Sequence, residues 1–175
     1  MKLHFILLGT AALLGIVGCG VKREANAALA AAEVLRKHIV LEQRMVITDT
    51  NSGQIVWSDG VILEITDSLP PPIKSLIDST SYHTDIQTTV RKVEEGLRTE
   101  YQPGRVREKS SRDGYIEFET DTPEVHALVN PVYVSYVQAR YPECSILVRS
   151  KYDPVVFAAK GQIRALIMPF KLSNK

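Results

Sequence analysis

The first twenty residues constrain the fold more than any other part of the chain, because they decide which residues are left to build a core. Lys2 stands beside Met1, and an apolar run follows from Leu3 to Val17. A short basic segment, an apolar stretch and a small residue at the cut are typical of an export signal that is removed from the mature protein. The run is also short for a bilayer-spanning helix, which needs about 20 apolar residues. We therefore expect residues 1–18 to be removed and residues 19–175 to fold.

The apolar run closes with Ile16-Val17-Gly18-Cys19. These four residues resemble the lipobox of bacterial lipoprotein precursors, which has an aliphatic residue three places before a cysteine and a small residue directly before it. The resemblance implies cleavage between Gly18 and Cys19, diacylglycerol on the Cys19 thiol, and acylation (with palmitate, for example) of the new amino end. Several acyl chains anchor a protein durably, whereas a single chain binds a membrane only marginally.

The same resemblance bears on the location of the protein. Lipoproteins kept in an inner membrane usually carry aspartate after the cysteine, so Gly20 favours the periplasmic face of the outer membrane in a host with two membranes. The alternative is an uncleaved N-terminal membrane helix in which Cys19 is incidental. Lipid on Cys19 would leave Cys144, the other cysteine of the chain, without an intrachain partner. An exposed lone thiol invites unwanted pairing outside the cytoplasm, so we expect Cys144 to be buried.

Composition indicates one globular domain and argues against nucleic-acid binding. The chain is 45% hydrophobic and 23% charged, which is too apolar for a disordered protein. The residues after Gly18 are enough for one core rather than two. Residues 1–18 contain one of the 21 Lys and Arg and none of the 20 Asp and Glu, so the remainder carries no formal net charge. Such a surface has no long-range field to attract nucleic acid or anionic lipid.

The mature part begins with a predicted long helix over residues 22–43, which are rich in Ala, Leu, Glu, Lys and Arg and contain no Gly or Pro. Leu29, Ala32, Leu35 (or Arg36) and Ile39 follow helical spacing. Two roles remain open for this helix: a stalk that carries the domain away from the bilayer, or a helix packed on the sheet of its own domain. We divide the chain into a signal (1–18), an anchor and helix (19–43), and a single domain (44–175).

Three short strands are expected next, in meander order. Residues 45–49 and 54–58 are β-rich and flank an Asn-Ser-Gly turn, and Asp59-Gly60 turns the chain again into residues 61–65. The three prolines at 70–72 should end this section as an extended connector, with recognition by a partner as the alternative. A brief helical turn from Ile73 to Asp78 would follow.

A second, amphipathic helix is predicted from Thr84 or Asp85 to about Tyr101. Its apolar residues line one face at helical spacing, and they are Ile86, Val90, Val93, Leu97 and Tyr101. Thr84 or Asp85 supplies the N-cap, and Pro103-Gly104 supplies the stop. We expect this helix to lie over a sheet. The polar residues 102–114 that follow favour a solvated loop, with an anion or head-group site as the alternative reading of its four basic side chains.

The remainder is rich in predicted strands. Residues 115–120 alternate apolar and acidic side chains, and residues 124–136 form an apolar run in which Pro131 indicates an edge position or a bulge. We also expect a strand over residues 145–149. A hairpin should follow, in which residues 155–159 pair with residues 163–170 around Gly161. The sequence therefore predicts an α+β fold, with a long N-terminal helix followed by a mostly antiparallel sheet and one amphipathic helix packed on it.

A search for catalytic or metal-binding motifs finds none. His38, His83 and His126 fall in separate predicted elements, without the spacing that brings metal ligands together. The serine-nucleophile, phosphate-loop, dinucleotide-binding and haem-attachment patterns are absent. Ser110-Ser111-Arg112-Asp113 lies in a loop with no identified base. Several tyrosines, namely Tyr133, Tyr136, Tyr141 and Tyr152, gather in the C-terminal half, where they could line a groove or cap the core. We expect no enzyme activity, no metal and no cofactor.

These observations favour a membrane-anchored lipoprotein that serves as a non-catalytic accessory or assembly subunit of a cell-envelope complex. Its expected partners are membrane lipid, through Cys19, and another protein of that complex. The alternative is a ligand-binding domain. The leading helix, the hairpin at 45–60 (MVITDTNSGQIVWSDG) and the closing hairpin at 157–170 (FAAKGQIRALIMPF) resemble the layout of extracytoplasmic PAS-like sensor domains. That resemblance would imply a small-molecule ligand.

Overall fold

The computed structural model describes residues 7–39, 46–49, 53–77, 85–107 and 114–170, with side chains over 23–39, 47, 53–76, 88–107 and 114–170. Its helices are α1 (Leu7–His38), α2 (Pro71–Ile77), α3 (Asp85–Gly96) and α4 (Pro131–Arg140). Its strands are β1 (Val46–Asp49), β2 (Ile55–Ser58), β3 (Ile62–Thr66), β4 (Gln102–Pro103), β5 (Arg105–Val106), β6 (Ile116–Glu119), β7 (His126–Val129), β8 (Ser145–Val148), β9 (Val155–Ala159) and β10 (Gln162–Ile167). Helices and strands mix along the chain, as expected of an α+β protein.

The strands form two antiparallel sheets. The larger has the order β1-β2-β3-β10-β9-β8-β4, and the smaller has the order β5-β6-β7. The expected meander of β1, β2 and β3 is confirmed, because β2 pairs with both of its neighbours. The expected closing hairpin of β9 and β10 is also confirmed. Its two turn residues, Lys160 and Gly161, both have positive φ, which matches the twist of a tight hairpin.

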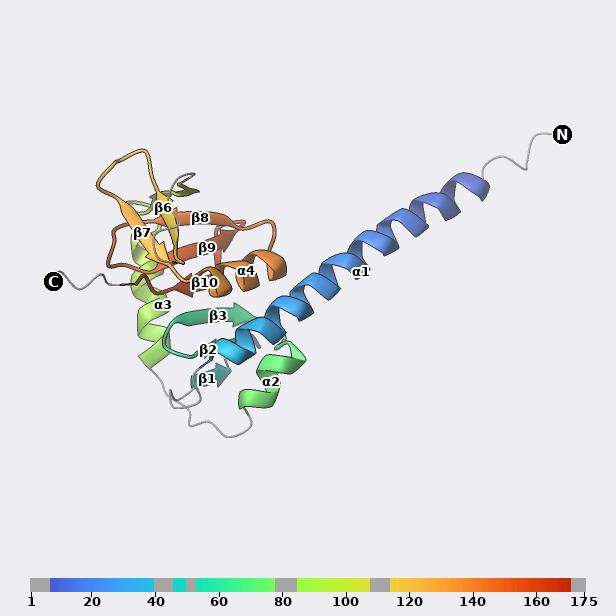
Figure 1. Ribbon diagram of the computed structural model, residues 1–175, viewed down its shortest axis with the longest axis horizontal. Coiled ribbons are helices and arrows are strands. Elements are labelled where there is room, and N and C mark those ends of the chain that lie inside the picture. The colour runs from blue at the N-terminus through green and yellow to red at the C-terminus, as the bar shows by residue number, and fades with distance from the viewer. Residues whose placement is uncertain (1–6, 40–45, 50–52, 78–84, 108–113, 171–175) are drawn as a thin grey trace.

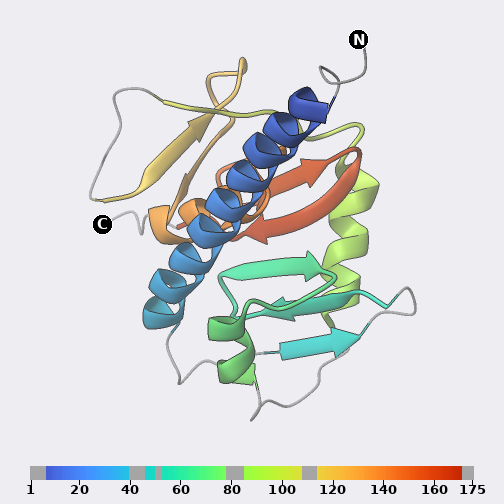
Figure 2. The ribbon, with the colours of Figure 1, turned by 90° about the vertical axis from the view of Figure 1, so that its right-hand side faces the viewer.

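The large sheet is covered on both faces, so β3 and β9 are buried along their whole length. On one face, Trp57, Phe157 and Ala165 pack with residues of α1, α2 and α4. On the other face, Leu63, Ile65, Val156 and Leu166 pack beneath α3, as that helix was predicted to do. Figures 1 and 2 show the same arrangement, with α3 alone on its side of the sheet. The sequence predicted one amphipathic helix packed on the sheet, whereas several helices cover it.

Helix α1 is anchored in the body of the protein by its C-terminal half. Ala32, Leu35 and Ile39 are at most 5% exposed, as predicted from their spacing, whereas Leu29 lies on the outer side and is 45% exposed. The main contacts of α1 are with α4 and α2. Figure 1 shows the helix leaving the body toward its N-terminal end. Helix α1 ends at His38 rather than near Gln43, and residues 40–43 lie outside the described part.

Helix α4 was predicted to be part of a strand over residues 124–136, and this prediction is wrong. Strand β7 ends at Val129, and Asn130 caps a helix whose first residue is Pro131. The Asn130 side chain accepts a hydrogen bond from the Val132 backbone N–H at 2.9 Å. Proline suits this first position because its missing N–H would have no partner inside the helix. The proline that suggested an edge strand therefore begins a helix.

The other prolines require a similar correction. Pro71 and Pro72 are the first two residues of α2 rather than an extended connector, and the helix runs to Ile77.

Helix α3 ends at Gly96, followed by turns, and does not reach Tyr101. Tyr101 is nevertheless buried with the predicted apolar face.

The predicted loop over 102–114 also contains structure. Residues 102–103 pair with β8 and residues 105–106 pair with β6. Arg105 contacts Glu119 and Asp121, both at 3.2 Å, and Arg107 contacts Glu117 at 3.1 Å. Arg105 and Arg107 are therefore paired within the protein but stay 66% and 54% exposed, as the solvated reading of this segment predicts. Lys109 and Arg112, on which the anion-site alternative also depends, lie outside the described residues. The Glu117 side chain is largely buried and forms an ion pair with Arg107.

Candidate functional site

The most polar feature of the protein interior is the fully buried carboxylate of Glu64 on β3. Its Oε2 accepts hydrogen bonds from Trp57 Nε1 at 2.6 Å and from the Tyr136 hydroxyl at 2.7 Å. Its Oε1 accepts from Arg140 Nε and from the Tyr141 hydroxyl, both at 2.6 Å. Each carboxylate oxygen therefore has two donors. We call these five residues the Glu64 network.

Arg140 connects the network to the surface. Its side chain is 16% exposed, and its Nη2 donates to the Thr66 hydroxyl at 2.7 Å and to the Ser68 backbone carbonyl. The guanidinium group thus joins the last turn of α4 to both β3 and the residues that follow it. Its planar fork suits this role, because several N–H groups point in fixed directions.

A second buried carboxylate lies at the other end of α4. The Tyr133 hydroxyl donates to Asp59 Oδ2 at 2.8 Å. Asp59 Oδ1 accepts from the backbone N–H groups of Val61 and Ile62, both at 2.9 Å. Asp59 therefore holds the turn between β2 and β3 in place and binds it to α4.

Local structure explains why these side chains meet. Ile62, Glu64 and Thr66 alternate along β3 and face α4, and Trp57 lies opposite Glu64 on β2. Tyr133, Tyr136 and Arg140 are spaced three and four residues apart, so they share one face of α4. The sheet and the helix thus present complementary rows. The predicted tyrosine cluster is confirmed as a core feature for Tyr133 and Tyr136, while Tyr152 is 58% exposed.

Burial changes the acidity of the donors. Desolvation, followed by the charge of Glu64, raises the pKa of both Tyr136 and Tyr141 above the ordinary value for tyrosine. Desolvation, followed by the charge of Asp59, does the same to the pKa of Tyr133. For Arg140, desolvation is the largest influence and lowers the pKa, but the interactions with Glu64, Tyr136 and Tyr141 together outweigh it, and the pKa is raised. The hydroxyls therefore stay protonated and the guanidinium stays charged.

This arrangement suits the joining of helix and sheet better than catalysis. A general base needs a free lone pair within reach of a substrate proton, whereas Glu64 is fully buried and accepts four internal hydrogen bonds. Within the described residues, Arg164 Nε is the buried side-chain polar atom that lacks a partner. All four donors to Glu64 are side chains of the protein itself, so the polar groups of the Glu64 network bind one another.

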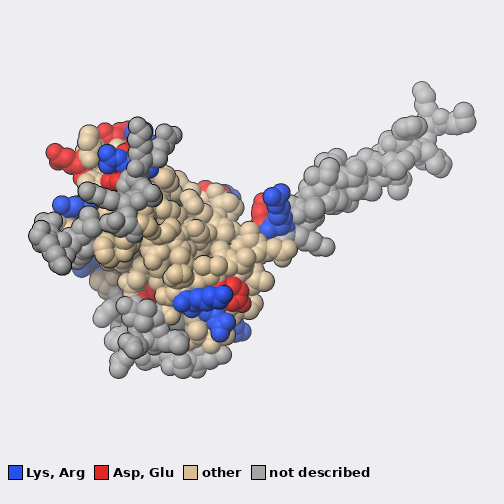
Figure 3. All heavy atoms as spheres, in the orientation of Figure 1, with Lys and Arg blue, Asp and Glu red and all other residues tan. Residues whose placement is uncertain are grey.

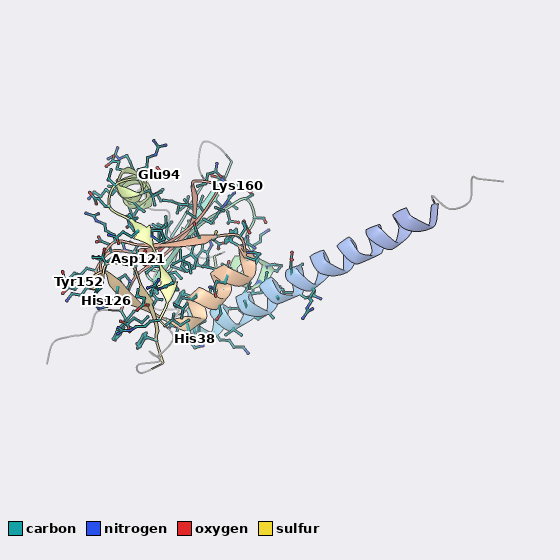
Figure 4. The ribbon with its side chains drawn as sticks, turned by 90° about the horizontal axis from the view of Figure 1, so that it is seen from above. His38, Glu94, Asp121, His126, Tyr152 and Lys160 are labelled. Atoms are coloured by element: carbon teal, nitrogen blue, oxygen red, sulfur yellow. The ribbon has the colours of Figure 1, made fainter. Side chains whose placement is uncertain are left out.

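The residues singled out from the sequence do not converge on one another. Gly18 and Cys19 fall within the bounds of α1, with side chains outside the described part. His38 ends α1 and His126 begins β7, as Figure 4 labels them, and His83 and residues 110–113 lie outside the described part. Cys144 is partly buried rather than fully buried. Desolvation, followed by the charge of Glu143, raises the pKa of its thiol to about 11.

Among the described residues, no group of three or more His, Cys, Asp or Glu side chains is arranged to hold a metal ion. In the same part of the chain, no helix combines the length and hydropathy needed to cross a bilayer. The face in Figure 3 carries small groups of charges of both signs, separated by broad uncharged areas.

Comparison of the chain with models of protein families, with curated proteins and with solved structures finds no match.

Proposed function

We propose that this protein is a lipid-anchored, non-catalytic accessory or assembly subunit of a cell-envelope complex. The observation that carries the proposal is the way α1 is built into the core. Ala32 and Leu35 are fully buried against the rest of the protein, while residues 23–27 on the same helix are exposed. A helix that leads directly from the proposed lipid site into the core would hold the folded domain beside the membrane.

The length of α1 sets the distance between lipid and domain. Ala32 lies thirteen positions after Cys19 and is the first fully buried residue among the described side chains of the helix. At about 1.5 Å per residue, this segment spans roughly 20 Å. The domain would therefore sit close to the head groups in a restricted orientation, which suits attachment to a neighbouring membrane complex. The inward-directed Glu64 network supports a structural role over an enzymatic one.

The anchor is tested by changing Cys19 to Ala in the full chain and separating membrane from soluble fractions. We expect release of the protein or accumulation of the unprocessed precursor. Cys144→Ser is the matched control, because it removes the other thiol and should leave membrane retention unchanged. Unchanged retention of Cys19→Ala would contradict the lipid anchor and favour the uncleaved-helix alternative.

The partner is tested by site-specific photo-crosslinking in intact cells, followed by extraction in mild detergent and mass spectrometry. The crosslinker is placed at Val34, which is 49% exposed on α1. Lys160, at the exposed tip of the β9–β10 hairpin, is the control position (Figure 4). The proposal predicts one defined envelope protein captured from Val34 and not from Lys160. A protein that remains monomeric in native extracts and captures no partner from either position would contradict it.

A further inference from the structure

A small pocket lies between α3, the turn after β2 and the C-terminal end of β10. It has a volume of about 260 Å³ and is lined by Ser58, Gly60, Ile62, Leu63, Thr89, Leu166 and Met168. Leu63 and Leu166 form its floor and belong to the core beneath α3. Thr89 and Met168 lie on its rim, and both are exposed. The pocket is on the opposite side of the sheet from α1 and the Glu64 network.

The walls of the pocket are held in place by hydrogen bonds. The Gly60 backbone N–H donates to Ser58 Oγ at 3.0 Å, and the Met168 backbone N–H donates to the Val61 carbonyl at 2.8 Å. Asp59, only 2% exposed, pins the same turn through two backbone N–H groups and is itself held by Tyr133. A ligand would therefore meet a preformed pocket, which lowers the entropic cost of binding.

The lining residues define the chemistry of a ligand. None of the seven is ionisable, so a charged molecule would lose its hydration without gaining a partner. The Ser58 oxygen accepts the Gly60 N–H, and among the described residues its own O–H has no acceptor. The hydroxyl is thus available to donate one hydrogen bond to a ligand. The volume suits a molecule of about ten non-hydrogen atoms, near the lower limit of typical ligand pockets.

We propose that this pocket binds a small neutral molecule with an apolar body and one hydrogen-bond acceptor, which is held by the Ser58 hydroxyl. The apolar body lies against Leu63 and Leu166, and Met168 adapts to its shape because its side chain is unbranched and flexible. This activity is independent of lipid on Cys19 and of any protein partner.

The probe for the experiment is acetophenone, which has an apolar ring and a single carbonyl acceptor. The full chain is placed in lipid nanodiscs, so that partition of the probe into lipid is the same for all variants. Binding is followed by the NMR signal of the ¹³C-labelled Met168 methyl group, assigned with Met168→Leu. For a ligand of this size we expect saturable binding with a Kd of about 1 mM.

Two variants decide the outcome. Thr89→Trp fills the rim from an exposed helix position and should weaken binding at least about tenfold, whereas Thr88→Trp, one residue away and also exposed, should leave it unchanged. Ser58→Ala should weaken acetophenone about fivefold and leave ethylbenzene, which lacks the acceptor, unaffected. The proposal is overturned by a Met168 signal that does not saturate, by equal binding in Thr89→Trp, or by equal losses of both probes in Ser58→Ala.

Discussion

Replacement of Glu64 by glutamine tests the role of the buried network most directly. The amide keeps the shape of the side chain but replaces one acceptor oxygen by an NH₂ donor. The tyrosine hydroxyls on each side can rotate to accept, but Trp57 Nε1 and Arg140 Nε can only donate. Because these two groups bind different oxygens of Glu64, either orientation of the amide leaves one of them facing another donor. The substitution also removes the counter-charge of Arg140.

The magnitude follows from these two losses. An unpaired buried donor costs about 1–3 kcal/mol, and breaking a buried ion pair costs about 3–5 kcal/mol. Arg140 is 16% exposed and keeps its bonds to Thr66 and Ser68, so the lower part of the range applies. We expect Glu64→Gln to lower the free energy of unfolding by about 3 kcal/mol, a large share of the about 5–15 kcal/mol typical of a domain.

The assay is urea denaturation followed by far-UV circular dichroism, which does not depend on the fluorescence of Trp57 inside the network. Glu94→Gln, on the exposed face of α3, is the control and should change stability by less than about 0.5 kcal/mol. Arg140→Met and the double variant complete a cycle in which the combined loss should fall short of the sum by more than about 1 kcal/mol. A loss below about 1 kcal/mol for Glu64→Gln would refute the reasoning.

Three further predictions follow from the structure. Burial raises the pKa of Tyr136, and it raises the pKa of Tyr101 to about 12. The free energy of unfolding should therefore be insensitive to these groups below pH 10 and fall above it, by about 1.4 kcal/mol per pH unit for each tyrosine. Denaturation as a function of pH measures this fall. Alkylation of Cys144 at pH 8 should be about 100-fold slower in the folded protein than in urea, because the raised pKa of about 11 lowers the fraction of thiolate. Mass spectrometry measures the rate, and a fast reaction of the folded protein would contradict the burial of this thiol. Asn130→Ala should cost about 1 kcal/mol in thermal or urea unfolding through loss of the α4 cap, whereas Ser135→Ala, exposed on the same helix, should have little effect.

Local patterns in the sequence were sufficient for elements whose residues repeat with a clear period. The turns at Gly53 and Gly161 located two hairpins, and the spacing of Val93 and its neighbours located α3. The prediction failed where two local signals disagreed. Residues 132–137 are rich in β-branched valine, which favours a strand, yet Asn130-Pro131 is a helix start. The cap prevailed because the helix buries two tyrosines and two valines in the core.

The Glu64 network was not anticipated, for a reason of distance along the chain. Glu64 stands in the middle of the apolar strand Ile62–Thr66, and a charge in such a run is a signal that it must be paired. Its partners on α4 and at the C-cap Tyr141, however, lie 72 to 77 residues further on. No spacing rule connects residues so far apart, and the helix that carries them was itself read as a strand. The partner of the carboxylate could therefore be named only once β3 and α4 were seen together.

The position of β10 has a consequence for the order in which the chain assembles during synthesis. The strand lies between β3 and β9, so residues 46–66 and residues 145–159 join one sheet through residues 162–167. A ribosome releases these linking residues after all the other strands of the sheet. Until then the early meander has no partner along β3, and the sheet stays divided in two. If residues 1–18 direct export, the chain would remain threadable at least until β10 has been made, because the sheet cannot close before then.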